Sequence, residues 1–276
     1  MIVDLHCHST ASDGALRPEA LVRRAAEQGV ELLAVTDHDQ LEGLTEARAA
    51  ARALRVKLID GVEISVTWRG LTLHVLGLRV DPGGAVLAQG LRAVRAGRLE
   101  RARAMSRALA QAGMRGTLEG ALRHAEQPAL VSRTHFARHL VELGVAADVR
   151  DVFRRYLVPG KPGYVPHRWA ALGDALAWIR GAGGQAVLAH PGRYALSAAA
   201  MEELLVEFRA GGGAGLEVVS GSHTPDQYAL FGALATKHGL AASRGSDFHA
   251  PGEGAELGAL PRLDARLRPI WHDWEI

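Results

Sequence analysis

The chain has 276 residues, of which 48% are hydrophobic and 22% charged, a composition that excludes a disordered protein. It carries 32 Lys and Arg against 30 Asp and Glu, and this net charge of +2 argues against a strongly basic nucleic-acid-binding protein. The single cysteine, Cys7, excludes an intramolecular disulfide and a zinc site built from several thiolates. With thirteen histidines in the chain, imidazole and carboxylate groups are the expected ligands of any bound metal.

The net charge conceals an uneven distribution along the chain. Residues 81–168 contain fifteen Lys and Arg and seven Asp and Glu, a local charge of +8, whereas the rest of the chain carries −6. No apolar run approaches the roughly 20 residues of a membrane span, and the start of the chain lacks the basic and apolar regions of a signal peptide. We therefore expect a cytoplasmic protein with no membrane association and no obligate protein partner.

The first third of the chain alternates predicted strands and helices. Short apolar runs predict strands at residues 2–5, 32–36, 57–63 and 71–78, and amphipathic runs predict helices at residues 18–29 and 43–54. Such alternation is typical of a parallel sheet or a barrel.

A basic segment interrupts this pattern after the turn at residues 81–84. Residues 91–113 are predicted to form one long helix with an arginine-rich face, and three or four shorter helices follow to about residue 156. The three prolines of residues 158–166 predict a stiff loop that leads back to the first domain. We interpret the segment as an α-helical insertion.

The α/β pattern then resumes. Helices are predicted at residues 172–181, 201–210 and 228–238, between strands at residues 185–189, 216–219 and 240–244. The chain is therefore predicted to be an α/β protein with about seven strands.

Histidine and carboxylate side chains gather on or just after these strands. They are His6 and His8, Asp37 and His38, Glu63, His74, His190, and Asp247 and His249, with Asp13 in the loop after the first pair. The carboxyl ends of the strands carry the chemistry in β/α barrels. Burial of so many ionisable groups without a compensating cation is costly, and this mixture of ligands suits Mn, Fe or Zn. The sequence therefore predicts a polynuclear metal site.

Taken in order, His6-x-His8, Thr36-Asp37-His38, Glu63, His74, His190 and Asp247-x-His249 resemble the motifs of the polymerase and histidinol phosphatase (PHP) superfamily. The resemblance covers residues 1–80 and 165–260. It implies a distorted (β/α)7 barrel, the PHP fold, that holds two or three divalent metal ions. Residues 1–80 and 165–276 would form this metal-binding barrel, and residues 81–164 would form a basic α-helical cap over the active site.

The resemblance also implies a role for each ligand. His6, His8, Glu63 and Asp247 would hold the first ion, Asp13, His38 and His249 the second, and Glu63, His74 and His190 the third. The metals would lower the pKa of a shared water that attacks phosphorus. Asp13, His38, Glu63, His190, Asp247 and His249 would thereby form the catalytic set. Asp37 is expected to orient a ligand, and Cys7, which points away from its neighbours, is expected to be inert packing.

Substrate-binding residues are expected mainly in the basic insertion. Arg133 and His135 lie in a Ser-Arg-Thr-His run, and Lys161 and Tyr164 lie in a constrained Gly-Lys-Pro-Gly-Tyr loop. Lys and Arg side chains there are suited to phosphate. Three further candidates lie in the barrel: Ser220, His223 and Arg244. We expect Arg92, Arg95, Arg103 and Arg107 to form a solvated helix face, and His124, His139, His167, His238 and His272 to be surface or packing residues.

Within the superfamily, this insertion resembles the subgroup of nucleoside bisphosphate phosphatases and RNase AM-like exonucleases. The resemblance implies removal of the 3′-phosphate from nucleoside 3′,5′-bisphosphates, for example conversion of adenosine 3′,5′-bisphosphate to AMP. It also implies 5′-3′ exoribonuclease activity on short 5′-phosphorylated RNA. The partner would be a phosphorylated nucleotide or an RNA 5′ end.

Two alternatives stay open at this point. One is histidinol-phosphate phosphatase, which the large helical insertion fits less well. The other is a non-catalytic, metal-stabilised interaction domain, which the complete ligand set disfavours. Amide hydrolysis, a related chemistry of metal-containing barrels, is a more distant possibility.

Overall fold

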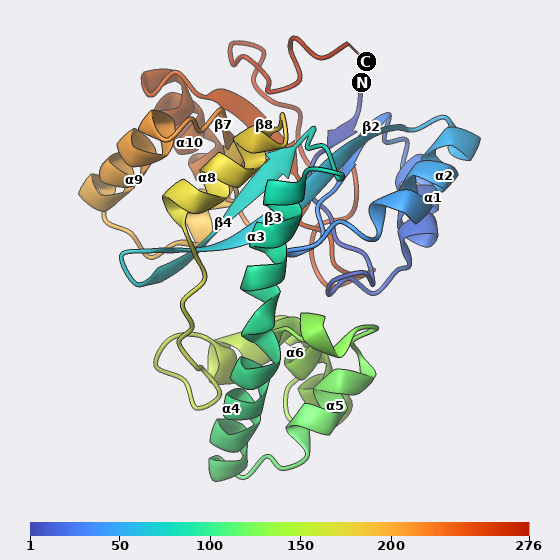
Figure 1. Cartoon of the computed structure of the whole chain (residues 1–276), viewed down its shortest axis with the longest axis vertical. Coiled ribbons are helices and arrows are strands. Elements are labelled where there is room, and N and C mark those ends of the chain that lie inside the picture. The colour runs from blue at the N-terminus through green and yellow to red at the C-terminus, as the bar shows by residue number, and fades with distance from the viewer. Residues whose placement is uncertain (276) are drawn as a thin grey trace.

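A computed structural model of the chain describes residues 1–275 and shows a nearly closed, barrel-shaped sheet (Figure 1). The strands follow the order β1 (Val3–Asp4), β2 (Leu32–Val35), β3 (Lys57–Trp68), β4 (Leu71–Leu78), β6 (Gln185–Leu188), β7 (Gly215–Ser220) and β8 (Ala241–Gly245). The short β5 (Ala170–Ala171) pairs with β3. The backbone N–H of Leu5, just after β1, donates to the Arg244 carbonyl of β8 at 3.0 Å and draws the two edges together. The predicted α/β barrel class is confirmed.

The sheet is mixed rather than wholly parallel. β3 and β4 form an antiparallel hairpin whose turn contains Arg69 and Gly70, and β4 also runs antiparallel to β6. β3 therefore continues five residues past its predicted end at Glu63. Its alternate residues Val62, Ile64, Val66 and Trp68 are buried in the largest apolar core. The two-residue period of a strand places Glu63 on the opposite face.

Helices cover the outside of the sheet in two groups (Figure 1). α1 (Pro18–Glu27) and α2 (Leu44–Leu54) pack on one side, and α8 (Leu172–Gly181), α9 (Ala198–Ala210) and α10 (Pro225–Lys237) pack on the other. A single-turn 3-10 helix, η3 (Pro191–Arg193), follows β6. At the start of β6, Trp274 of the C-terminal segment donates from Nε1 to the Gln185 side chain at 2.7 Å. The C-terminal segment thus lies at the opposite end of β6 from His190.

The central helical segment projects from the barrel (Figure 1). It contains α3 (Ala85–Ala96), α4 (Arg98–Gln111), α5 (Thr117–Arg123), η1 (Pro128–Leu130), α6 (Arg133–Glu142), α7 (Val149–Val152) and η2 (Phe153–Leu157). The predicted single helix over residues 91–113 was wrong, because it begins at Ala85 and is divided at Gly97 into α3 and α4. The ring of His167 packs directly against Gly97, and a Cβ atom on residue 97 would lie only 2.5 Å from Cε1 of His167.

The two parts of the molecule have separate apolar cores. Leu87 and Leu91 of α3 belong to the large core beneath α8, whereas Met105 of α4 and Phe136 of α6 belong to a core formed only by residues 99–165. The change of core therefore falls near Gly97. The division into a barrel of residues 1–80 and 165–276 and a cap of residues 81–164 stays a prediction, with α3 packed on the barrel side. Among residues 1–275, no helix combines the length and apolarity needed to span a bilayer.

Candidate metal centre and its cavity

Nine histidine and carboxylate side chains converge at one end of the barrel. Seven lie on loops just after strands, and Glu63 and His74 lie within the β3–β4 hairpin. They are His6 and His8 after β1, Asp13 in the same loop, His38 after β2, Glu63, His74, His190 after β6, and Asp247 and His249 after β8. Every predicted metal ligand is therefore brought to one place.

A first group surrounds Glu63 Oε2 and Asp247 Oδ1. The Nε2 atom of His6 lies 3.3 Å from each of these oxygens. The Nε2 atom of His8 lies 3.3 Å from Glu63 Oε2 and 3.2 Å from Asp247 Oδ1. These four atoms face a common point, as the ligands of one ion would.

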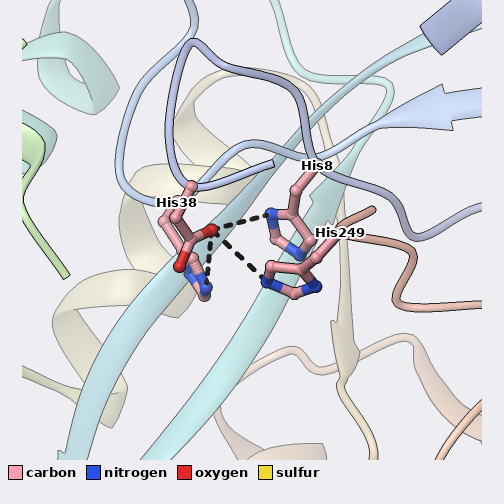
Figure 2. A group of neighbouring side chains, drawn as sticks. His8, His38 and His249 are labelled. Atoms are coloured by element: carbon pink, nitrogen blue, oxygen red, sulfur yellow. Dashed lines mark ion pairs between the residues drawn. The ribbon is translucent and has the colours of Figure 1, made fainter. Parts of the chain in front are cut away.

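A second group surrounds Asp13. Figure 2 shows the imidazoles of His8, His38 and His249 directed at one carboxylate oxygen, which is Asp13 Oδ1. Its distances are 3.3 Å to His249 Nε2, 3.9 Å to His38 Nε2 and 4.0 Å to His8 Nδ1. His8 thus turns one ring nitrogen to each of the first two groups.

A third group surrounds the other side of Glu63. Its Oε1 atom lies 2.9 Å from His74 Nδ1 and 3.0 Å from His190 Nε2. Its Oε2 atom lies 3.1 Å from His38 Nδ1. Burial alone would raise the pKa of Glu63, but the surrounding imidazoles of His74, His38 and His6 hold this pKa well below its usual value. Glu63 is therefore an ionised carboxylate shared by two groups of ligands.

The unsatisfied atoms in this cluster fit divalent ions. Six buried atoms that face these groups have no hydrogen-bond partner among residues 1–275: His6 Nε2, His8 Nδ1, Asp13 Oδ1, His38 Nδ1, Glu63 Oε2 and His74 Nδ1. Two ligand atoms held about 2.1 Å from one ion, at roughly 90–110° to each other, are about 3.0–3.4 Å apart. Most of the separations above fall near this range. The cluster of imidazoles and carboxylates can therefore bind metal.

Two buried carboxylates hold the ligands in place. Glu217 of β7 lies with Oε1 3.0 Å from His6 Nδ1, and its Oε2 accepts from the His190 backbone N–H at 2.6 Å. Asp37 accepts from the hydroxyls of Ser9 and Ser12, each at 2.6 Å. Asp37 thus fixes the loop that carries Asp13 rather than a ring. Both carboxylates orient ligands without joining the cluster.

Replacement of Glu217 by glutamine should weaken metal binding by about 10- to 100-fold, because the neutral amide no longer supports the His6 ring as a basic ligand. Competition for the metal against a chromogenic chelator measures this affinity. Glu207→Gln is the matched control, since Glu207 accepts a hydrogen bond from Trp68 far from the cluster. Equal affinities in the two variants would show that Glu217 does not support the metal centre.

Two residues of the cluster have left-handed backbone conformations. His190 has φ of 27° and Asp247 has φ of 55°, values that side chains with a Cβ atom adopt rarely. Such conformations persist where surrounding contacts enforce them. Glu217 supplies one such contact through the His190 N–H. The strain thus lies where each chain segment turns from its strand into the metal cluster.

A cavity of about 360 Å³ opens above the cluster. Ligand residues form its floor, and residues of the helical segment form its wall, among them Arg98, Arg101, Ser132, Arg133, Thr134 and Phe153. Ser132 donates from its hydroxyl to Asp13 Oδ2 at 2.8 Å and so links α6 to the floor. Residues of the helical segment thus line the cavity beside the ligand cluster.

Three arginines in the wall have no carboxylate partner among residues 1–275: the exposed Arg150, and Arg101 and Arg133, which are half-buried. Burial, with Arg133 and Arg98 nearby, lowers the pKa of Arg101 to about 9. Burial, with Arg193 nearby, lowers the pKa of Arg133 to about 10. Each guanidinium packs on an aromatic ring, Arg101 on Trp169 and Arg133 on Phe153. An anion in the cavity would relieve the repulsion between these cations.

Four cavity arginines were not predicted as site residues: Arg98, Arg101, Arg150 and Arg193. Arg193 donates to Asp247 Oδ2 at 2.8 Å, and its position three residues after His190 was a usable sequence signal. Arg98 is buried and pairs with Asp39. The arginines of α4 look alike in the sequence, so only the packing of the helix separates Arg101 from Arg103, whose side chain is exposed.

Several predicted substrate contacts have structural roles instead. His135 is fully buried and does not line the cavity, because its Nδ1 atom accepts from the Ser132 N–H at 3.0 Å and caps α6. Arg244 donates to the Leu260 carbonyl at 2.6 Å, on a different side of β8. Both ring nitrogens of His223 are used, since Nδ1 donates to the Val218 carbonyl and Nε2 accepts from the Gly192 N–H.

The remaining predicted contacts also lie outside the cavity lining. Lys161 is exposed on its loop, Ser220 is fully buried within β7, and Tyr164 is half-buried beside Arg101 and Arg133 without lining the cavity. Of the seven predicted substrate residues, only Arg133 is therefore placed in the wall.

A nearly closed α/β barrel with a His, Asp and Glu cluster at one end defines the class of barrel proteins whose ligand set can bind metal. The PHP domain family model matches residues 4–145, and the chain belongs to this family. The predicted resemblance is thereby confirmed.

Known relatives extend over almost the whole chain. The 3′,5′-nucleoside bisphosphate phosphatase of Chromobacterium violaceum is 53% identical over 99% of this chain and 96% of its own length. The 5′-3′ exoribonuclease Rnm of Escherichia coli is 44% identical over 100% of this chain and 94% of its own length. A solved structure described as an amidohydrolase from Chromobacterium violaceum, with bound sulfate and no metal, has a TM-score of 0.96 at 52% identity, covering 98% of this chain and 95% of that one.

Proposed function

We propose that the protein is a metal-dependent phosphoesterase that removes the 3′-phosphate from nucleoside 3′,5′-bisphosphates, such as adenosine 3′,5′-bisphosphate. The observation that carries the proposal is one cavity with two anion-binding ends: the metal-binding cluster at its floor and the unpaired Arg101 and Arg133 in its wall. A substrate with two phosphates matches both ends. The Chromobacterium violaceum relative is named 3′,5′-nucleoside bisphosphate phosphatase, which describes this reaction. The reaction also belongs to the expected class, the hydrolysis of phosphoester bonds.

The cluster would hold two or three divalent ions of Mn, Fe or Zn. His6, His8, Glu63 and Asp247 are the proposed ligands of the first ion, and Asp13, His38 and His249 those of the second. Glu63 would bridge to a third ion with His74 and His190. Converging atoms of His6, His8, Glu63 and Asp247, and of Asp13, His38 and His249, support the first two sets. The approach of His74 and His190 to Glu63 Oε1 supports the third, although His38 also lies within reach of Glu63 and His74.

Such ions activate water and neutralise the charge on phosphoryl oxygens. The residues of this chain bind and orient the substrate at that position. The guanidinium of Arg193, beside Asp247 and 45% exposed, can donate to a phosphoryl oxygen at the rim of the floor. The ligands Asp13 and Glu63 are buried on the floor of the cavity. No side-chain nucleophile is required, and the buried Cys7 donates to the Ala34 carbonyl away from the cluster.

The 5′-phosphate would bind to the wall. Arg101 and Arg133 repel each other in the free protein, and a phosphate between them would accept hydrogen bonds from both guanidinium groups. With the 5′-phosphate bound to Arg101 and Arg133 in the wall, only the 3′-phosphate would reach the ligand cluster on the floor. The 3′-phosphate would therefore be the one hydrolysed.

A 5′-3′ exoribonuclease activity on short 5′-phosphorylated RNA is a second candidate. The Escherichia coli relative carries that name at 44% identity. The same arginine wall would hold the terminal 5′-phosphate, with the first phosphodiester placed over the cluster in the position of a 3′-phosphate. The preference between mononucleotide and RNA substrates thus depends on whether the cavity has room for a second nucleotide attached to the 3′-phosphate.

A substrate panel with Mn²⁺-loaded protein tests the proposal. We expect release of phosphate from adenosine 3′,5′-bisphosphate at a kcat/KM at least ~100-fold above that for histidinol phosphate, which lacks the second phosphate held by about two charge-assisted hydrogen bonds. Preferential turnover of histidinol phosphate would favour the alternative phosphatase. Tight metal binding without turnover of any substrate would favour the interaction domain. Cytoplasmic location and the absence of an obligate protein partner stay predictions.

A further inference from the structure

We infer that the helical segment contains a second, separate metal site, formed by His124, His139 and Glu142, that takes Zn²⁺ or a similar divalent ion. His124 ends α5, and His139 and Glu142 lie one turn apart on α6. The site is independent of the proposed function, because it shares no residue with the barrel cluster.

The three side chains offer a complete set of converging ligand atoms. Glu142 Oε2 lies 3.2 Å from His124 Nε2 and 3.7 Å from His139 Nδ1, and the three atoms lie within 4.8 Å of one another. Two imidazoles and one carboxylate are a common zinc ligand set that leaves the fourth position to water. Glu142 has a 57% exposed side chain, so water can reach that position.

Neither imidazole nitrogen has another use. His124 Nε2 and His139 Nδ1 are buried atoms without a hydrogen-bond partner among residues 1–275, although both point at the same carboxylate oxygen. A simple ion pair looks different in this protein, since His238 Nε2 hydrogen-bonds Glu202 Oε2 at 2.7 Å. An ion between the three atoms would satisfy all of them at once.

The position of the His139 ring is built into the fold. His139 is 4% exposed and packs directly against Gly120 of α5. A Cβ atom on residue 120 would lie 2.0 Å from the ring. His124, the C-cap residue of α5, follows Gly120 by one turn, so the same side of the helix contacts one imidazole and supplies the other. This face continues into the apolar core formed by Ala121 and Leu140.

An ion at this position would join α5 to α6. The start of α6 carries Ser132 and Arg133, which contact or line the catalytic cavity. The end of α6 carries His139 and Glu142. Occupancy would therefore stiffen the helix that supports the cavity wall, without placing the ion in the cavity.

Zinc stoichiometry tests the inference. Full-length protein is saturated with Zn²⁺, desalted and analysed by inductively coupled plasma mass spectrometry, for the wild type and for His124→Ala and Glu142→Ala. We expect each variant to hold one equivalent fewer than the wild type. The control His238→Ala, which breaks a histidine–carboxylate pair without a third ligand, should keep the wild-type content. Equal zinc content in all four proteins would overturn the site.

Thermal unfolding separates loss of the site from loss of the fold. Without zinc, His124→Ala should unfold at nearly the same temperature as His238→Ala, and added Zn²⁺ should raise the midpoint of His238→Ala by several degrees more. A variant that had lost the fold would also lose the barrel ions, and its deficit would exceed one equivalent. An identical zinc-induced shift in both variants would contradict the inference.

Discussion

Replacement of Glu63 by glutamine is expected to lower kcat/KM for adenosine 3′,5′-bisphosphate by about 10²- to 10³-fold, the scale of losing one preorganised electrostatic group in an active site. Glu63 is fully buried and approaches five imidazoles: those of His6, His8, His38, His74 and His190. The amide keeps the size of the side chain but removes the negative charge that holds two groups of ligands. Steady-state kinetics with saturating Mn²⁺ measure the loss.

The metal content of Glu63→Gln should fall in parallel with its activity. Glu203→Gln is the matched control, because Glu203 pairs with Arg69 on the surface and should leave both quantities unchanged. If Glu63→Gln retained its full metal content and its activity, the shared carboxylate would not be a ligand, and the division of the cluster into three groups would be wrong.

Replacement of Arg101 or Arg133 by alanine should lower kcat/KM for the bisphosphate by about 10- to 100-fold, the value of one or two charge-assisted hydrogen bonds. The change should appear mainly in KM, because the wall binds the phosphate that does not react. Adenosine 3′-phosphate lacks the 5′-phosphate, so its hydrolysis should be nearly unaffected by either substitution. Parallel kinetics on the two substrates test this.

Arg103→Ala is the matched control for Arg101→Ala. It lies on the same helix, and its side chain is 53% exposed and faces away from the cavity. A loss of activity that is equal for both substrates would indicate that Arg101 or Arg133 supports the fold of the cap rather than the 5′-phosphate. A loss as large in Arg103→Ala would indicate a general effect of charge.

The ligand cluster was predictable because most of its residues directly follow strands, and the carboxyl ends of these strands lie at one end of the barrel. His6 and His8 share a face because they are two residues apart in an extended segment. Both follow β1, and His38, His190 and Asp247 follow β2, β6 and β8. All of these side chains therefore lie at one end of the sheet. The His74 position was predictable only as part of the motif. It lies mid-strand and reaches the cluster because β4 runs antiparallel to β3 and is paired there with Ser65.

The substrate side was less predictable because it depends on contacts between distant segments. His135 stood in a promising Ser-Arg-Thr-His run, yet the same run is a capping box that consumes its Nδ1 atom. Arg101 and Arg103 are identical in local sequence terms, and only the docking of α4 against Trp169 turns the first toward the cavity. Local patterns do not reveal which partner a long cationic side chain meets.

The metal site inferred in the helical segment illustrates the same limit. His124 and His139 were expected to be surface or packing residues, because no strand end or motif connects them. The packing of α5 on α6 across Gly120 is what brings them to one carboxylate. The uneven charge of the sequence has a related explanation, since its basic segment supplies Arg98, Arg101 and Arg133 to the wall above an acidic floor.

The identity of the product tests the central claim most directly. Mn²⁺-loaded protein is incubated with adenosine 3′,5′-bisphosphate, and the products are separated by ion-exchange chromatography against authentic AMP and adenosine 3′-phosphate. A wall that holds the 5′-phosphate and a floor that hydrolyses the 3′-phosphate yield AMP and one equivalent of inorganic phosphate. Formation of adenosine 3′-phosphate, or no release of phosphate from metal-loaded protein, would contradict the account.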